Sequence, residues 1–260
     1  MTTYAKPRPT LRRPRRLVAN ILIYLALISI AATTMAPFFW MLSSSLKQRS
    51  VIFAYPPQWI PNPVVWRNYI EAWNAIPFAR FVQNTLQIAF LSMAGQLIFA
   101  SLAGFGFARF EFPLKPLLFS MLLAVMMVPG TVNIVPRFLI FSKLGWINTP
   151  LPLIVPSVFS STFGTFLFRQ HMLAVPKELE DAARIDGAGP FGIYWRVFLP
   201  LCKPAAAVLA TFTFIGQWNS FFDPLVYLTD VDKMTINVGL AFVRAESGTE
   251  WHWLMAGSCT

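Results

Sequence analysis

Hydrophobic residues in this chain gather in long blocks, and short polar stretches separate them. A helix needs about 20 apolar residues to cross the roughly 30 Å hydrocarbon core of a membrane, and five blocks approach or exceed that length. The pattern therefore predicts an all-α integral membrane protein, a polytopic helical bundle with about five transmembrane helices. The predicted spans are residues 17–42, 84–108, 116–136, 151–168 and 203–222.

Glycine and proline mark two of these spans. The second span contains Gly95, Gly104 and Gly106, and small residues let membrane helices pack closely. The third span contains Pro129-Gly130, which predicts a kink within the helix, tolerated where neighbouring helices satisfy the backbone.

A basic, proline-rich arm precedes the first span. Residues 1–16 are polar and show no apolar period, so we expect a disordered arm at a membrane surface. A signal peptide would give a similar start, with Ala31-Ala32 near its cleavage site. The apolar block is too long for that, and the chain continues as a membrane protein, so we interpret the block as an uncleaved helix.

The basic residues predict an orientation. With the N-terminus inside, thirteen Lys and Arg residues fall on the inner side and eight on the outer side. Because cytoplasmic loops carry an excess of Lys and Arg, we expect the arm and the segment 176–204 to be cytoplasmic. Residues 17–258 would form the membrane domain of a multi-pass protein.

Composition supports a membrane protein and excludes several other classes. Only 12% of residues are charged and 56% are hydrophobic, whereas soluble domains carry about 25% charged residues. The net charge of +10 is dispersed between apolar blocks, which favours contact with membrane lipid over nucleic acid. Two cysteines and two histidines show no metal-ligand spacing and no disulfide framework, so we expect no metal and no cofactor.

The longest charged, amphipathic segment runs from Pro176 to Pro204. Pro176 suits a helix start and the acids after it suit the first turn. Gly187 is the expected left-handed terminator, and Gly189-Pro190 restarts a second short helix. From these features alone, a solvated surface helix is an equally good interpretation.

The same segment resembles the EAA loop of ABC importer permeases. The similarity lies in Glu180-Asp181-Ala182-Ala183, Asp186-Gly187-Ala188 and Leu199-Pro200, with Asp181 where the family usually has Glu. The resemblance implies that this loop docks on an ATPase and transmits its movement. The residues that it implicates are Glu180, Asp181, Ala182, Ala183, Asp186, Gly187 and Pro200.

Weaker motifs in the same order resemble the carbohydrate-uptake branch, such as the maltose and glycerol-3-phosphate permease subunits. They include Pro56-Pro57, Asn84-Thr85, 145–149 (GWINT) and Trp218-Asn219. The resemblance implies a MetI-like fold in the bacterial cytoplasmic membrane. It also implies three partners, which are a cytoplasmic ABC ATPase dimer, a second homologous permease and an extracytoplasmic solute-binding protein.

The C-terminal region departs from the family pattern. Members usually have a further helix after the segment resembling 253–258, whereas this sequence ends at Cys259-Thr260. Since no run of about 18 apolar residues follows Phe222, we expect five spans and hypothesise that the final helix is missing.

The sequence contains no signature of catalysis. It lacks a GxxxxGK[ST] phosphate loop and a plausible Ser-His-Asp set, so we expect a non-enzyme whose ATP is hydrolysed by partner subunits. A proton-coupled carrier would need acidic or His residues in mid-span, and a membrane enzyme would need clustered polar groups at one membrane face. An ABC permease for a non-sugar solute stays open.

Polar residues at membrane depth are candidates for solute contact. Trp218, Asn219 and Ser220 end the fifth predicted span, and the Trp ring could stack on a sugar. The alternative is hydrogen bonding between helices with an interfacial Trp.

Overall fold

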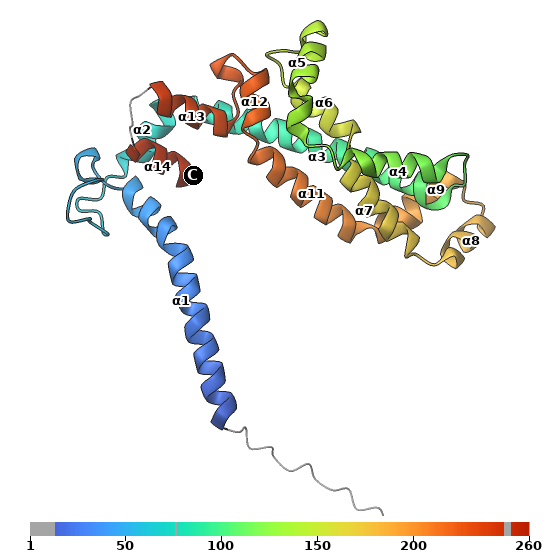
Figure 1. The fold of residues 1–260 in the computed structure, drawn as a ribbon, viewed down its shortest axis with the longest axis horizontal. Helices are drawn as coiled ribbons and strands as arrows, with labels where there is room; N and C mark the ends of the chain where they lie inside the picture. The colour runs from blue at the N-terminus through green and yellow to red at the C-terminus, as the bar shows by residue number, and fades with distance from the viewer. Residues whose placement is uncertain (1–13, 76, 247–250, 260) are drawn as a thin grey trace, which may run out of the picture. The chain divides into compact units, whose positions relative to one another are not determined.

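The computed structural model describes residues 14–75, 77–246 and 251–259, and these residues form helices and loops without a strand. The chain divides into two compact units. The first comprises residues 1–72 and 249–260, and the second comprises residues 73–248. Each unit is described separately (Figure 1).

The first unit is built on the long helix α1 (Pro14–Ser45). Its apolar side chains are exposed from Val18 to Phe39, as suits a helix surrounded by lipid. α1 contacts α14 (Trp251–Cys259). After α1 come the short 3₁₀ turn η1 (Arg49–Val51) and the start of α2 (Arg67–Ala75), where Asn68 donates to the carbonyls of Ser45 and Lys47 at 2.8 Å each.

The second unit is organised around α3 (Phe78–Arg109). This helix packs against α6 (Leu151–Phe159), α7 (Thr162–Leu173) and α11 (Lys203–Trp218). The other helices of the second unit are α4 (Lys115–Val125), α5 (Ile134–Lys143), α8 (Lys177–Ile185), α9 (Pro190–Ile193), α10 (Leu199–Leu201), α12 (Phe222–Tyr227) and α13 (Ile236–Glu246). Shorter turns are η2 (Gly130–Asn133), η3 (Tyr194–Phe198, a π-helical turn) and η4 (Val231–Lys233).

Three continuous candidates for membrane spans are Val18–Ser45, Phe78–Arg109 and Leu151–Leu173. Two bent helix pairs bring the number to five if each pair is one span. The predicted span 116–136 is not one kinked helix, because α4 and the segment Gly130–Lys143 meet at 91°. The break has a local cause: Pro129 donates no backbone hydrogen bond and is extended (φ −59°, ψ 128°).

Other boundaries also differ from the predicted ones. α3 begins at Phe78 rather than Asn84, α7 continues to Leu173, and α11 ends at Trp218. Helix ends depend on caps and tertiary contacts rather than on hydropathy alone.

Close helix packing depends on glycine at two crossings. A Cβ on Gly104 would lie 2.6 Å from the Phe168 Cβ and 3.0 Å from the Arg169 backbone nitrogen. Gly164 similarly approaches Ala100 and Leu209. Around these crossings lies the largest buried apolar cluster, which includes Phe105, Phe168, Met172, Phe198, Cys202 and Leu209.

Replacing Gly104 by valine should therefore destabilise the second unit by about 1–3 kcal/mol, the usual cost of overpacking a core. Unfolding of the detergent-solubilised protein would measure it. Gly106→Val is the matched control on the same helix, because nothing lies within 4 Å of a Cβ there. Equal stability of the two variants would contradict this account of the α3–α7 contact.

Candidate functional site

Helix α8 begins after Pro176 and ends before Gly187, as its sequence predicts. Glu178 and Glu180 lie in the first turn, where the helix dipole favours acids. Gly187 has φ +82°. Its N–H donates to the Arg184 carbonyl at 3.0 Å, and the Ala188 N–H donates to the Ala183 carbonyl at 2.9 Å. This pair of bonds is a Schellman motif, so the corner after α8 is a defined structure that requires a left-handed residue.

The side chains of α8 divide into two faces. Glu180 is buried, and Ala183 packs partly buried against the main apolar cluster. Asp181 and Ala182 are exposed. Leu179 and Ile185 are also exposed, at 46% and 86%. Apolar, small and acidic residues thus share a solvent-facing surface, which we call the docking face (Leu179, Asp181, Ala182 and Ile185).

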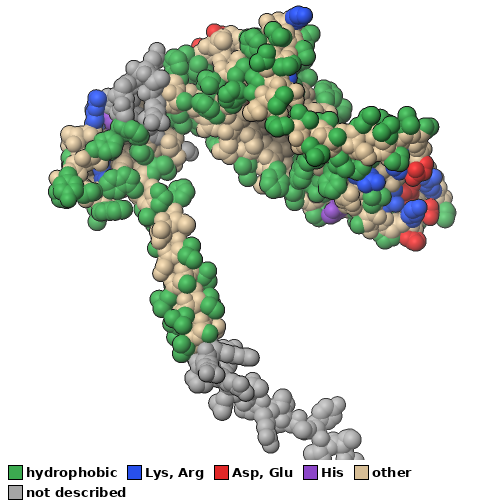
Figure 2. Space-filling model, in the orientation of Figure 1, with side chains coloured by type: hydrophobic (Ala, Val, Ile, Leu, Met, Phe, Trp, Pro, Cys, Tyr) green, Lys and Arg blue, Asp and Glu red, His purple; other side chains and the backbone are tan. Residues whose placement is uncertain are grey.

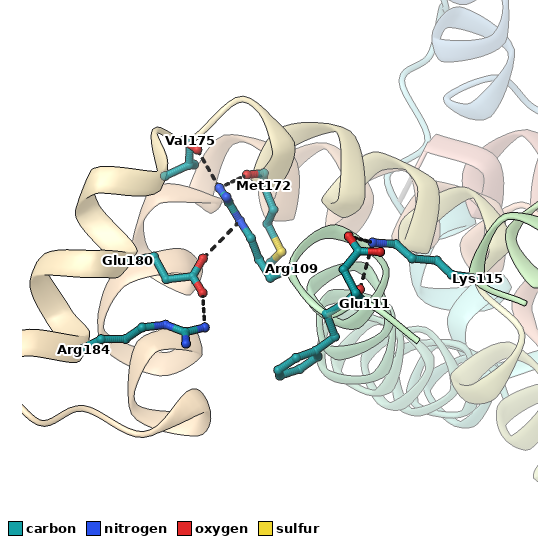
Figure 3. Close-up of polar contacts among 8 residues, drawn as sticks. Arg109, Glu111, Lys115, Met172, Val175, Glu180 and Arg184 are labelled. Carbon is teal, nitrogen blue, oxygen red and sulfur yellow. Dashed lines mark hydrogen bonds and ion pairs between the residues drawn. The ribbon is translucent and has the colours of Figure 1, made fainter. Parts of the chain in front are cut away.

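Glu180 points away from the docking face and into an ion pair (Figure 3). One carboxylate oxygen accepts a hydrogen bond from Arg184 Nη2 at 2.7 Å. The other lies 3.8 Å from Arg109 Nε, an ion-pair contact beyond hydrogen-bond length. The structure thus separates Glu180, which faces inward, from its neighbour Asp181, which faces outward.

The chain after Gly187 continues along the same end of the unit. Phe191 and Trp195 are 69% and 59% exposed, whereas the Tyr194 ring is buried and its hydroxyl pairs with Ser101 Oγ at 2.7 Å. Asp186 caps α8 at the C-terminus, and Pro200 lies in α10 on the surface. Figure 2 shows charged side chains of both signs gathered at the end that carries α8 and α9.

A second polar group lies inside the bundle, between α3, α6, α7 and α11. Gln96 is its centre: its carbonyl oxygen accepts from Ser161 and Thr213 at 2.9 Å each, and its amide donates to Ser157 at 2.8 Å. The Gln217 amide also donates to Ser157, at 3.1 Å. We call these five residues the polar cluster.

The polar cluster borders two cavities of about 360 Å³ each. Both are lined by Gln217, Ser220 and Asp223. The first also touches Gln96 and Thr213, and the second also touches Ser157, Ser160, Asn133 and Arg137. Amides and hydroxyls facing a cavity can donate to and accept from a polyol.

Of the three residues predicted for solute contact, the structure brings Ser220 alone to these cavities. The Trp218 ring stacks on Phe214, with centroids 5.8 Å apart, and its carbonyl accepts from Asn237. The Asn219 side chain donates to the Ile215 carbonyl of its own helix. Trp218 and Asn219 thus make helix contacts, the alternative that the sequence also allowed.

Sequence reasoning missed the polar cluster. One signal was present, because Thr213 and Gln217 are four residues apart and share a face of α11. Gln96 gave no such signal, since its partners come from other helices. In the parts of the chain that the structure describes, no group of three His, Cys, Asp or Glu residues could hold a metal ion.

The region that contains this site matches a known protein family. A family model described as "Binding-protein-dependent transport system inner membrane component" matches residues 96–257. The sn-glycerol-3-phosphate transport system permease protein UgpE of Yersinia enterocolitica is 33% identical over 213 residues, 79% of this chain and 75% of that protein. The protein of the same name from Escherichia coli O157:H7 is 33% identical over 245 residues, 91% of this chain and 87% of that protein.

A solved structure shares the fold. The chain superposes with a TM-score of 0.81 on a chain of "a bacterial ABC transporter involved in the import of the acidic polysaccharide alginate". The two are 20% identical, and the match covers 96% of this chain and 92% of the other. The family match from residue 96 includes both α8 and the polar cluster.

Proposed function

Because this chain belongs to the family of binding-protein-dependent transport system inner membrane components, we propose that it is the permease subunit of an ABC importer for a carbohydrate-type solute. The solute class is a sugar or a glycerol phosphate, like that of the relatives named for sn-glycerol-3-phosphate transport. The protein is a multi-pass protein of the bacterial inner membrane, and its family consists of transport components rather than enzymes.

The polar cluster is the observation that supports a sugar or a glycerol phosphate as the solute. Polar side chains within an apolar bundle are functional suspects, and this set faces cavities instead of filling a closed core. The lining offers amides, hydroxyls, the Asp223 carboxylate and the Arg137 guanidinium. We assign the solute path to this lining. Ser220, which follows α11, would contact the solute, and Trp218 and Asn219 would support the helices around it.

Helix α8 is the proposed site of coupling to ATP hydrolysis. A partner ATPase dimer binds the docking face, with Asp181 fixing the register and Ala182 allowing close approach. Glu180 and Ala183 attach α8 to the bundle. Asp186 and Gly187 form the turn after α8, and Pro200 lies in the segment that leads to α11. The ATPase hydrolyses ATP, and its closure moves α8.

In this proposal the N-terminus and α8 are cytoplasmic, an orientation that the distribution of basic residues favours. A second, homologous permease completes the solute path, and an extracytoplasmic binding protein delivers the solute. In a related alginate transporter, the solved structure is "in complex with alginate pentasaccharide-bound periplasmic protein", which supports this expectation.

An uptake screen tests the proposed function. Cells lacking carbohydrate importers would express this chain with a candidate partner permease, ATPase and binding protein from the same genome. We expect binding-protein-dependent uptake of at least one sugar or glycerol phosphate. Uptake of amino acids, peptides or polyamines alone would overturn the assignment of the solute class.

Replacing Asp181 by lysine should sharply lower recovery of the ATPase with the purified permease. The substitution reverses a charge on the docking face, and like charges at an interface oppose association. Pull-down of the ATPase measures the effect. Asp232→Lys is the control, since it makes the same change at an exposed position outside the docking face; equal recovery in both variants would show that Asp181 does not contact the ATPase.

A further inference from the structure

The side chain of Arg109 joins four elements at the end of the second unit that carries α8. It extends from the last residue of α3. Its Nη2 donates to the carbonyls of Met172 and Val175 at 2.5 and 2.6 Å. Its Nε faces Glu180 of α8 at 3.8 Å (Figure 3). Its guanidinium carbon lies 4.5 Å from the centre of the Phe198 ring in η3.

These contacts are almost fully buried. The side chains of Arg109 and Glu180 are 5% and 11% exposed. Met172 lies in the last turn of α7 and Val175 follows this helix, and a cation there opposes the negative end of the helix dipole. Without Arg109, the buried Glu180 carboxylate would keep only the half-exposed Arg184 of its own helix as its charged partner among the described residues. The buried ionic contact between α3 and α8 would then be lost, which is unfavourable.

Resting on the proposed function, we propose that Arg109 is a positioning residue that makes α8 and α3 move together when the ATPase moves α8. α3 runs from this end of the unit to Gln96, the centre of the polar cluster. A displacement of α8 would therefore be transmitted to the solute path through the Arg109 side chain and helix α3. Without Arg109, α8 would keep the apolar contacts of Ala183 with the main buried cluster.

Arg169 provides a matched control. It is a second arginine near this end of the unit, its Nε donates to the Phe107 carbonyl of α3 at 3.2 Å, and its guanidinium carbon lies 4.2 Å from the Phe119 ring centre. It contacts α3 and α4 rather than α8. Arg109→Gln and Arg169→Gln thus each remove one positive charge, a hydrogen bond to a backbone carbonyl and a contact with a Phe ring. Only the first removes the link to α8.

The experiment uses the complete transporter in proteoliposomes and measures both solute uptake and ATP hydrolysis. In Arg109→Gln, we expect the solute moved per ATP hydrolysed to fall about ten-fold or more, since a buried charge pair is broken, while the ATPase still co-purifies. Arg169→Gln should keep the wild-type ratio, and Arg109→Lys should restore part of it, because lysine keeps the charge but not the fork of donors. Combining Arg109→Gln with Glu180→Gln should do no more harm than either alone, as expected of coupled partners.

A second readout does not depend on the solute. Hydrogen exchange of the amides in residues 177–185 should be faster in Arg109→Gln than in the wild type and Arg169→Gln. A wild-type transport-to-hydrolysis ratio in Arg109→Gln, or unchanged exchange in α8, would overturn the role of Arg109. Failure of the wild-type complex to import any carbohydrate would instead overturn the proposed function, and the exchange measurement would then decide the role of Arg109 alone.

Discussion

Replacing Gly187 by proline should abolish solute uptake while the protein still inserts in the membrane. Gly187 has φ +82°, and its N–H donates to the Arg184 carbonyl. A proline ring fixes φ near −65° and removes the N–H, so the Schellman corner after α8 cannot form. The docking face would then be presented at a different angle to the ATPase, because the corner fixes how α8 joins α9.

The matched control for this variant is Gly189→Pro, two residues further along the chain. Gly189 already has φ −71° and ψ 170°, nothing lies within 4 Å of a Cβ built there, and Ala188 before it is not helical. Proline fits that backbone without strain. Uptake in proteoliposomes should therefore survive at position 189 and be lost at 187; loss at both positions would mean that any stiffening of the loop is harmful and that the left-handed corner is not the cause.

Replacing Gln96 by leucine should lower uptake about ten-fold or more, the factor that matches about 1.4 kcal/mol and the upper range of one net hydrogen bond. The side chains of Ser161 and Thr213 would lose their acceptor, and Ser157 would lose a donor. The cavity would also lose an amide that faces the solute path. Uptake kinetics measure the change, and ATPase co-purification should stay at the wild-type level because α8 is untouched.

Gln87→Leu serves as its control. Gln87 lies on the same helix but borders a different, mainly apolar groove with Leu86 and Phe90. Uptake in this variant should stay near the wild-type value. If Gln96→Leu transports normally, the polar cluster only stabilises the packing of the helices, and the solute path lies elsewhere.

Local sequence signals predicted the ends of α8 well. Proline, acids and glycine act on the backbone within a few residues, and the structure has the helix from Lys177 to Ile185 with a left-handed Gly187. Hydropathy likewise indicated the membrane class and the approximate spans. It could not indicate the 91° break after α4, since a proline in a membrane span can bend a helix or end it.

Interactions between segments far apart in the chain could not be predicted from the sequence. Gln96 and Thr213 are 117 positions apart, and their hydrogen bond exists because α3 and α11 cross at that level. The two acidic neighbours Glu180 and Asp181 look alike in the sequence, yet one is buried beside Arg109 and the other is exposed. Only the packing of α8 on the end of α3 distinguishes them.

The most direct test of the proposed function is accumulation of the solute by proteoliposomes that contain this chain, its partner permease and the ATPase. ATP would be supplied on the side of α8, and the binding protein with labelled solute on the other side. We predict accumulation against the concentration gradient that requires both ATP and the binding protein. Equal uptake without ATP, or with the binding protein left out, would contradict the assignment of this chain to an ATP-driven importer.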